Sequence, residues 1–144
     1  MEEKTNFELS ILVVDDDENI RVVLQKTLEK KGYHVSTCKS AEEALITLQR
    51  SFFHVVITDI LMAEMSGVEL LHKIKEMNYL MQIFIMTSHS TLPNVIQCMQ
   101  GGAYDFFEKP LKIGDILVSL SEAARRASRW SSLYNRYSLS SKSK

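Results

Sequence analysis

The chain has 144 residues, of which 45% are apolar, and a formal net charge of −1 at pH 7. That length suits one ordinary domain with its own core. The two cysteines are too few for a disulfide scaffold, and no apolar run approaches the roughly 20 residues needed to cross a bilayer. The composition therefore argues against secreted, membrane and wholly disordered proteins. It predicts a cytoplasmic protein with reduced thiols.

Charge is divided unevenly along the chain. Residues 1–124 carry 11 basic and 18 acidic side chains, whereas residues 125–144 carry six basic side chains and no acidic one. This pattern predicts an acidic body followed by a basic, serine-rich tail. Such a tail is typical of an interaction segment, although a solvated chain end has the same composition.

The chain begins its regular structure with a strand pattern and then a helix pattern. Residues 11–14 form a continuous apolar run, as expected for a strand that is buried on both faces. Apolar residues at helical spacing follow over 20–28. Asp16 or Asp17 is the expected cap of this helix, and Gly32 is expected to end it.

The same alternation is repeated four more times. A strand pattern followed by a helix pattern is found at 33–38 with 41–48, at 53–58 with 68–74, at 82–87 with 95–99, and at 104–107 with 113–124. Ser40 and Glu43 form a capping box at the start of the second helix. Five such repeats predict an α/β fold, in which helices cover both faces of a doubly wound parallel sheet through right-handed crossovers.

Polar residues stand where four of the predicted strands end. They are Asp15, Asp16 and Asp17 after the first strand, Asp59 after the third, Thr87 at the end of the fourth, and Lys109-Pro110 after the fifth. Taken singly, each residue is more typical of a cap or a turn. Ligand sites of open α/β sheets lie outside the carboxyl ends of the strands. Because all these polar residues are expected at that edge of the sheet, their joint position predicts a ligand site there.

Three carboxylates at one edge need a compensating charge. Two of them about 4 Å apart repel by about 4 kcal/mol at an effective dielectric constant near 20. The cluster is stable if a cation binds or a carboxyl is protonated, and hard oxygen ligands suit Mg²⁺. A magnesium ion, a lysine and a hydroxyl placed together can stabilise a phosphoryl group during its transfer. An aspartate can itself accept that group.

Four segments together make the chain recognisable. They are ILVVDDDENIRVVLQKTLEKKGY, VVITDILMAEMSGVELLHKI, IMTS and GGAYDFFEKPL. In this order and at these spacings, residues 9–125 resemble the receiver domain of two-component response regulators, the phosphoacceptor domain of chemotaxis-regulator type. The resemblance implies a three-layer, doubly wound (βα)5 flavodoxin-like fold with a five-stranded parallel sheet. It also implies Mg²⁺ as cofactor, a sensor histidine kinase as phosphoryl donor, and an output protein or domain as partner.

The resemblance also assigns roles to particular residues. It implies phosphorylation of Asp59, with Mg²⁺ held by Asp16, by Asp59, by the backbone carbonyl of Leu61 and, through water, by Asp15. Lys109 and Thr87 would contact the phosphoryl group, and Thr87 and Phe106 would form the switch that alters the surface of the fourth helix, fifth strand and fifth helix. The Lys109–Pro110 bond would be cis.

Two positions depart from the family pattern. Ala63 stands where proline is usual, which predicts a less rigid loop after Asp59. Phe106 lacks the hydroxyl of the tyrosine often found at its position. Neither change alters the chemistry of the predicted site.

Other functions remain open at this point. One is a receiver-like module that binds a partner without phosphorylation. Another is a magnesium-dependent phosphohydrolase with Asp15 as nucleophile and Asp17 as general acid, but the chain lacks a cap domain to hold a substrate. A flavodoxin-like cofactor carrier is disfavoured because the first loop lacks phosphate-cradling glycines. We expect no enzyme activity beyond self-catalysed phosphorylation and dephosphorylation.

The tail carries a pattern of its own. Trp130, Leu133, Tyr134 and Tyr137 follow helical spacing, which predicts that the fifth helix continues over about 125–138. An exposed aromatic face usually meets a partner, either a second receiver or an output domain, and the alternative is that the stripe folds back on its own domain. Direct nucleic-acid binding ranks lowest. The expected division is an N-terminal extension at 1–8, a receiver domain at 9–125, and a tail or linker at 126–144.

Overall fold

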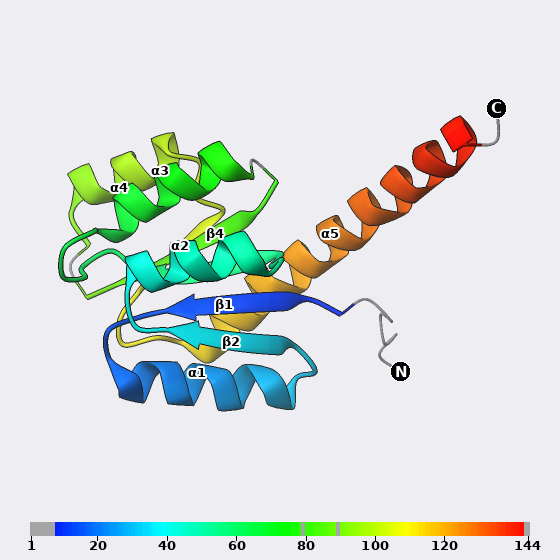
Figure 1. Ribbon diagram of the computed structural model, residues 1–144. Coiled ribbons are helices and arrows are strands. Elements are labelled where there is room, and N and C mark those ends of the chain that lie inside the picture. Colours follow the sequence, from blue (N-terminus) through cyan, green and yellow to red (C-terminus); the bar gives the residue numbers. More distant parts are fainter. Residues whose placement is uncertain (1–7, 79, 89, 143–144) are drawn as a thin grey trace.

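Strands and helices alternate along the chain in the computed structural model, which describes residues 8–78, 80–88 and 90–142 (Figure 1). The elements are β1 (Ser10–Val14), α1 (Glu18–Lys30), β2 (His34–Cys38), α2 (Ala41–Arg50), β3 (Val55–Asp59), α3 (Gly67–Met77), β4 (Gln82–Thr87), α4 (Leu92–Gln100), β5 (Asp105–Glu108) and α5 (Ile113–Lys142). Every predicted strand and helix is therefore present.

The five strands form one parallel sheet in the order β2-β1-β3-β4-β5. The chain leaves β1 in one direction to make β2 and then returns to the other side of β1 to make β3. This reversal leaves a crevice at the carboxyl ends of β1 and β3, where such sheets bind ligands. The doubly wound parallel sheet predicted from the sequence is confirmed.

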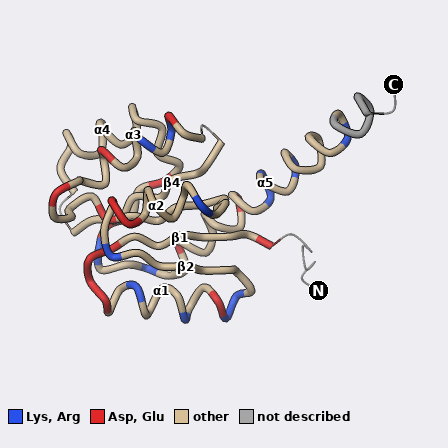
Figure 2. The backbone as a smooth tube through the Cα atoms, in the orientation of Figure 1, with Lys and Arg blue, Asp and Glu red and all other residues tan. Residues whose placement is uncertain are grey.

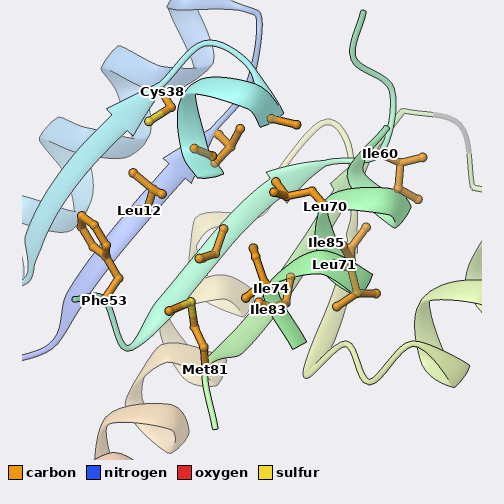
Figure 3. Close-up of a cluster of buried hydrophobic side chains, with 14 of the residues drawn as sticks. Leu12, Cys38, Phe53, Ile60, Leu70, Leu71, Ile74, Met81, Ile83 and Ile85 are labelled. Atoms are coloured by element: carbon orange, nitrogen blue, oxygen red, sulfur yellow. The ribbon is translucent and has the colours of Figure 1, made fainter. Parts of the chain in front are cut away.

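Alternate residues of each central strand face two separate apolar clusters. Ile11 and Val13 of β1 pack with α1 and α5, whereas Leu12 and Val14 pack with α2, α3 and α4. Figure 3 shows the cluster that contains Leu12, in which side chains of the sheet meet Leu70, Leu71 and Ile74 of α3. Because helices cover both faces of the sheet, its strands are continuous apolar runs.

Side-chain caps set the helix starts. The side chains of Asp17, Ser40, Ser66 and Thr91 accept backbone N–H groups at the starts of α1, α2, α3 and α4. Of the two expected caps of α1, Asp17 is therefore the one used. Gly32 follows α1 with φ of +93°, as expected for the residue after a helix.

The solvent-facing side of α4 differs from what its pattern suggested. Ile96 and Met99 mark this helix in the sequence, but they are 41% and 70% exposed, and Cys98 is the residue that α4 buries. Leu92, one turn earlier, is 72% exposed. Leu92, Ile96 and Met99 have the spacing i, i+4 and i+7, so they form an apolar stripe on the outer face of α4.

Helix α5 continues well beyond the body of the molecule (Figure 1). Its first turns pack on the sheet through Ile116, Leu120 and Ala123. It then runs without interruption to Lys142, so the predicted continuation of the helix is confirmed. The projecting part exposes Trp130 and Tyr134. None of the described helices is long and apolar enough to cross a membrane.

Candidate functional site

An acidic cluster lies at the carboxyl ends of β1 and β3. Asp15 directly follows β1, Asp59 is the last residue of β3, and the two strands are hydrogen-bonded neighbours. Carboxylate oxygens of Asp15, Asp16 and Asp59 all lie within 4.8 Å of one another. Asp15 and Asp59 are buried, whereas Asp16 is exposed at the mouth of the cluster. Figure 2 shows the acidic residues of the β1–α1 loop gathered at this edge.

Lys109 supplies the positive charge of the site. Its Nζ donates hydrogen bonds to Asp15 Oδ2 at 2.9 Å and to Asp59 Oδ2 at 2.6 Å. Burial by itself lowers the pKa of Lys109, but the hydrogen bonds to Asp59 and Asp15 outweigh burial, so the pKa is raised. The Lys109–Pro110 bond is cis, as expected. One ammonium against three carboxylates leaves the site with excess negative charge.

Backbone groups fix the two buried carboxylates. Asp15 Oδ1 accepts the N–H of Asp17 at 2.8 Å, and Asp59 Oδ1 accepts the N–H of Leu61 at 3.1 Å. Arg21 Nη1 donates to the carbonyl oxygen of Asp15 at 2.8 Å, which ties α1 to the same loop. Each buried carboxylate therefore presents one oxygen to Lys109 and the other to a backbone donor.

Asp17 does not join this cluster. Its side chain accepts the N–H of Asn19 at 2.9 Å as the cap of α1, and the cluster comprises Asp15, Asp16 and Asp59. The phosphohydrolase interpretation needs Asp17 as a general acid beside Asp15. The capping role therefore weakens that interpretation.

The excess negative charge of the site affects the pKa of Asp16. Partial burial, then the neighbouring carboxylates of Asp15 and Asp59, raise the pKa of Asp16. A divalent cation among these oxygens would relieve the repulsion. Carboxylate oxygens with an open, solvent-facing side are the donor set that Mg²⁺ prefers, so the residues present fit this metal.

We expect the Mg²⁺ affinity of the site to fall as pH is lowered through the raised pKa of Asp16. The metal binds the ionised carboxylate, so protons compete with it. Asp16→Asn should weaken binding at least 10-fold and flatten the pH dependence. Calorimetric titration at a series of pH values, from about pH 4 near the ordinary aspartate pKa up to about pH 7.5, measures both effects. Asp17→Asn is the matched control, because asparagine also caps helices. Equal losses in the two variants would contradict this account.

The remaining predicted residues line the neighbouring strands. Thr87 ends β4 and is buried, and its carbonyl oxygen accepts the N–H of Lys109 at 2.8 Å. Phe106 lies on β5, opposite Ile85 of β4, and is partly buried against the cluster below α2, α3 and α4. Leu61 contributes its backbone to the site while its side chain is about half exposed.

Two further residues shape the site, and the sequence patterns assign no role to either of them. Glu42 of α2 accepts the N–H of Met65 at 3.2 Å, which ties the loop after Asp59 to α2. Gly67 begins α3 against the backbone of β3, where an added Cβ would lie 2.1 Å from the carbonyl oxygen of Asp59. The sequence does carry a signal for Gly67, because a glycine at the start of a helix pattern points to close packing.

Comparisons of sequence connect this arrangement to known proteins. The sequence pattern of the family described as "Response regulator receiver domain" matches residues 11–121. The C4-dicarboxylate transport transcriptional regulatory protein DctD of Rhizobium meliloti is 41% identical over 118 residues, which are 82% of this chain and 25% of that protein. The DNA-binding transcriptional regulator NtrC of Salmonella typhimurium is 38% identical over 114 residues, 79% and 24% of the two chains. The chain thus spans about a quarter of these relatives.

Solved structures show the same fold. A response regulator receiver domain protein from Methanospirillum hungatei superimposes with a TM-score of 0.81 at 30% identity, covering 85% of this chain and 98% of that one. The beryllofluoride-activated NtrC4 receiver domain dimer superimposes with a TM-score of 0.77 at 32% identity, covering 81% and 97%.

Proposed function

Because this chain belongs to the response regulator receiver domain family of two-component signalling, we propose that it accepts a phosphoryl group on Asp59 from a sensor histidine kinase. The observation that supports this most is the placement of Asp59. Its carboxylate is hydrogen-bonded to Lys109 and shares one crevice with Asp15 and Asp16. We propose a receiver at residues 9–125 and a tail or linker at 126–144, which continues α5 as far as Lys142, in a protein that acts in the cytoplasm.

The chemistry is a single phosphoryl transfer. A carboxylate oxygen of Asp59 forms a bond to phosphorus while the bond from phosphorus to the donor imidazole nitrogen breaks, which leaves an acyl phosphate. Lys109 and the Thr87 hydroxyl stabilise phosphoryl oxygens by charge and hydrogen bonding. Mg²⁺, held by Asp16, Asp59, the Leu61 carbonyl and, through water, Asp15, would neutralise further charge. Apart from this reaction and the hydrolysis of its product, we propose no catalytic activity.

We propose that phosphorylation switches the surface formed by α4, β5 and α5. Thr87 ends β4 beside the site, and Phe106 lies on the adjacent β5. The outer face of α4 carries the exposed stripe of Leu92, Ile96 and Met99. An exposed apolar stripe on one of the helices of this surface suits contact with an output partner.

Treatment with acetyl phosphate and Mg²⁺ should raise the intact mass of the protein by one phosphoryl group. Chelation of Mg²⁺, or Asp59→Asn, should abolish the rise. An equal rise in Asp59→Asn would contradict the assignment of Asp59. If the wild-type mass stays unchanged while a partner still binds, the chain is instead a phosphorylation-independent interaction module.

We further propose a homodimer through α4-β5-α5 and the projecting part of α5. Trp130, Tyr134 and Tyr137 are exposed on that projection, and the similar NtrC4 receiver forms a dimer when activated by beryllofluoride. Sedimentation equilibrium with beryllofluoride should show dimers of the full chain at about 100 μM, and monomers of a chain ending at Ala127. Monomers of both chains, with and without beryllofluoride, would contradict the dimer.

A further inference from the structure

Two adjacent hollows lie at the end of the sheet opposite Asp59. Gln82, the first residue of β4, lines both of them, whereas Asp59 and Thr87 are the last residues of their strands. The hollows lie where α5 leaves the body, and their volumes are about 420 Å³ and about 670 Å³. Volumes of this order suit small-molecule ligands. Nothing in the phosphorylation chemistry above uses these hollows.

The smaller one, which we call the apolar hollow, is lined mainly by hydrocarbon. Its walls include Phe53, Leu80 and Met81 from the body, and Trp130 and Tyr134 from α5. Trp130 is more than half exposed, so a ligand can reach part of its side chain. A planar aromatic ring placed here would displace water and stack on the Trp130 indole. Stacking of this kind tolerates many types of ring.

The larger one, which we call the basic hollow, carries Lys75, Arg126 and Arg129. The described residues that line it include no acidic side chain, although the body as a whole is acidic. Figure 2 shows the basic residues following one another along the projecting part of α5. Guanidinium groups offer planar pairs of donors that match phosphate oxygens.

Neither arginine of the basic hollow forms an ion pair with a described carboxylate. The ion pairs found among the described residues involve neither Arg126 nor Arg129. The Arg126 guanidinium lies 5.5 Å from the centre of the ring of Tyr104, a residue that lines neither hollow, and this contact leaves the positive charge of Arg126 in place. Lys75 Nζ donates to the carbonyl oxygen of Met81 at 2.7 Å, which holds its stem against the same wall. The positive charges of the two arginines are therefore not neutralised by an ion pair with a described carboxylate, which favours an anionic ligand in this hollow.

Trp130 and Arg126 line both hollows, so an apolar compartment and a cationic compartment share one wall. We propose that the two together bind a nucleotide, with its base against Trp130 and its phosphates on Arg126 and Arg129. Gln82 lines both hollows, so its amide would hydrogen-bond a polar edge of the ligand. A ring that bears phosphates satisfies both compartments at once, whereas a plain anion or a plain aromatic ring satisfies only one.

Such a ligand would join parts of the molecule that lie far apart in the sequence. The basic hollow takes Lys75 from α3, Gln100 from the end of α4, and Arg129 from the projecting part of α5. A bound nucleotide would fix the direction of α5 relative to the body. It would therefore act as a second input on the helix, separate from the phosphorylation of Asp59.

The single tryptophan of the chain makes the site directly observable, because Trp130 is the only source of indole fluorescence. The full chain is titrated with GTP and with ATP in the absence of Mg²⁺, so that the acidic site does not contribute. We expect saturable quenching with a dissociation constant below about 1 mM for at least one of them. Guanosine and pyrophosphate alone should each bind at least about 10-fold more weakly than the better nucleotide.

Arg129→Ala should weaken nucleotide binding about 10-fold, whereas Arg136→Ala, which removes an exposed arginine outside both hollows, should leave it unchanged. Trp130→Leu should also weaken nucleotide binding about 10-fold. Calorimetry measures the affinity of this variant, because it has lost its indole fluorescence. The proposal is overturned by no saturable binding of either nucleotide, by equal weakening in the two arginine variants, or by binding of a single-stranded oligonucleotide alone.

Discussion

Lys109→Met is expected to slow phosphorylation by acetyl phosphate about 100-fold. The Lys109 ammonium donates hydrogen bonds to both Asp15 and Asp59, so it holds the acceptor in place and is positioned to neutralise the incoming phosphoryl group. Methionine approximates the length and the apolar stem of the side chain but removes the charge and the donors. The rate is followed by intact mass at fixed acetyl phosphate and saturating Mg²⁺.

The matched control for Lys109→Met is Lys112→Met, which removes an exposed lysine three residues later. The control should be phosphorylated at the wild-type rate. Mg²⁺ binding, measured separately by calorimetry, should survive in Lys109→Met because the three carboxylates remain. A wild-type rate in Lys109→Met, or a loss explained entirely by lost Mg²⁺ binding, would remove Lys109 from the reaction.

Gly67→Ala is expected to lower the free energy of unfolding by about 3 kcal/mol. The new Cβ would lie 2.1 Å from the Asp59 carbonyl oxygen and 2.8 Å from Cα of Ile60, and both atoms belong to the backbone at the end of β3. The backbone cannot move away from the new Cβ without also displacing Asp59. The N–H of Gly67 also donates to the Ile60 carbonyl at 2.8 Å, which holds α3 close to β3.

Gly114→Ala supplies the control for Gly67→Ala. An added Cβ at Gly114 meets no atom within 4 Å, and Gly114 lies in α5, so alanine there should stabilise the protein by about 0.5 kcal/mol. Urea unfolding of both variants gives the two changes in free energy. Equal stability of Gly67→Ala and the wild type would mean that α3 does not need its close approach to Asp59.

The fold could be predicted from the sequence because its patterns are local and regular. Residues 11–14 are apolar on both faces of β1, and Ser40 caps α2, so each signal is contained in a few neighbouring residues. The joint position of Asp15, Asp59 and Lys109 followed from the rule that parallel strands end at one edge. The hydrogen bond between Asp59 and Lys109, which are 50 positions apart, needed the structure.

The features that escaped prediction depend on contacts between distant segments. Ile96 and Met99 look like a buried face, but α4 turns Cys98 inward instead. Choosing between Asp16 and Asp17 as the cap of α1 required knowing that Asp16 lies beside Asp59. The two hollows beside Trp130 form only because α5 passes the starts of β3 and β4, and no pattern within one segment encodes that passage.

The most direct test of phosphorylation at Asp59 is to locate the modified residue chemically. Borohydride reduces an aspartyl phosphate to homoserine and leaves free carboxylates unchanged, so peptide mass mapping identifies the acceptor. After treatment with acetyl phosphate and Mg²⁺, homoserine should appear at position 59 alone. Homoserine at position 15 or 16, or an unmodified Asp59 in a protein that has gained a phosphoryl group, would contradict the central claim.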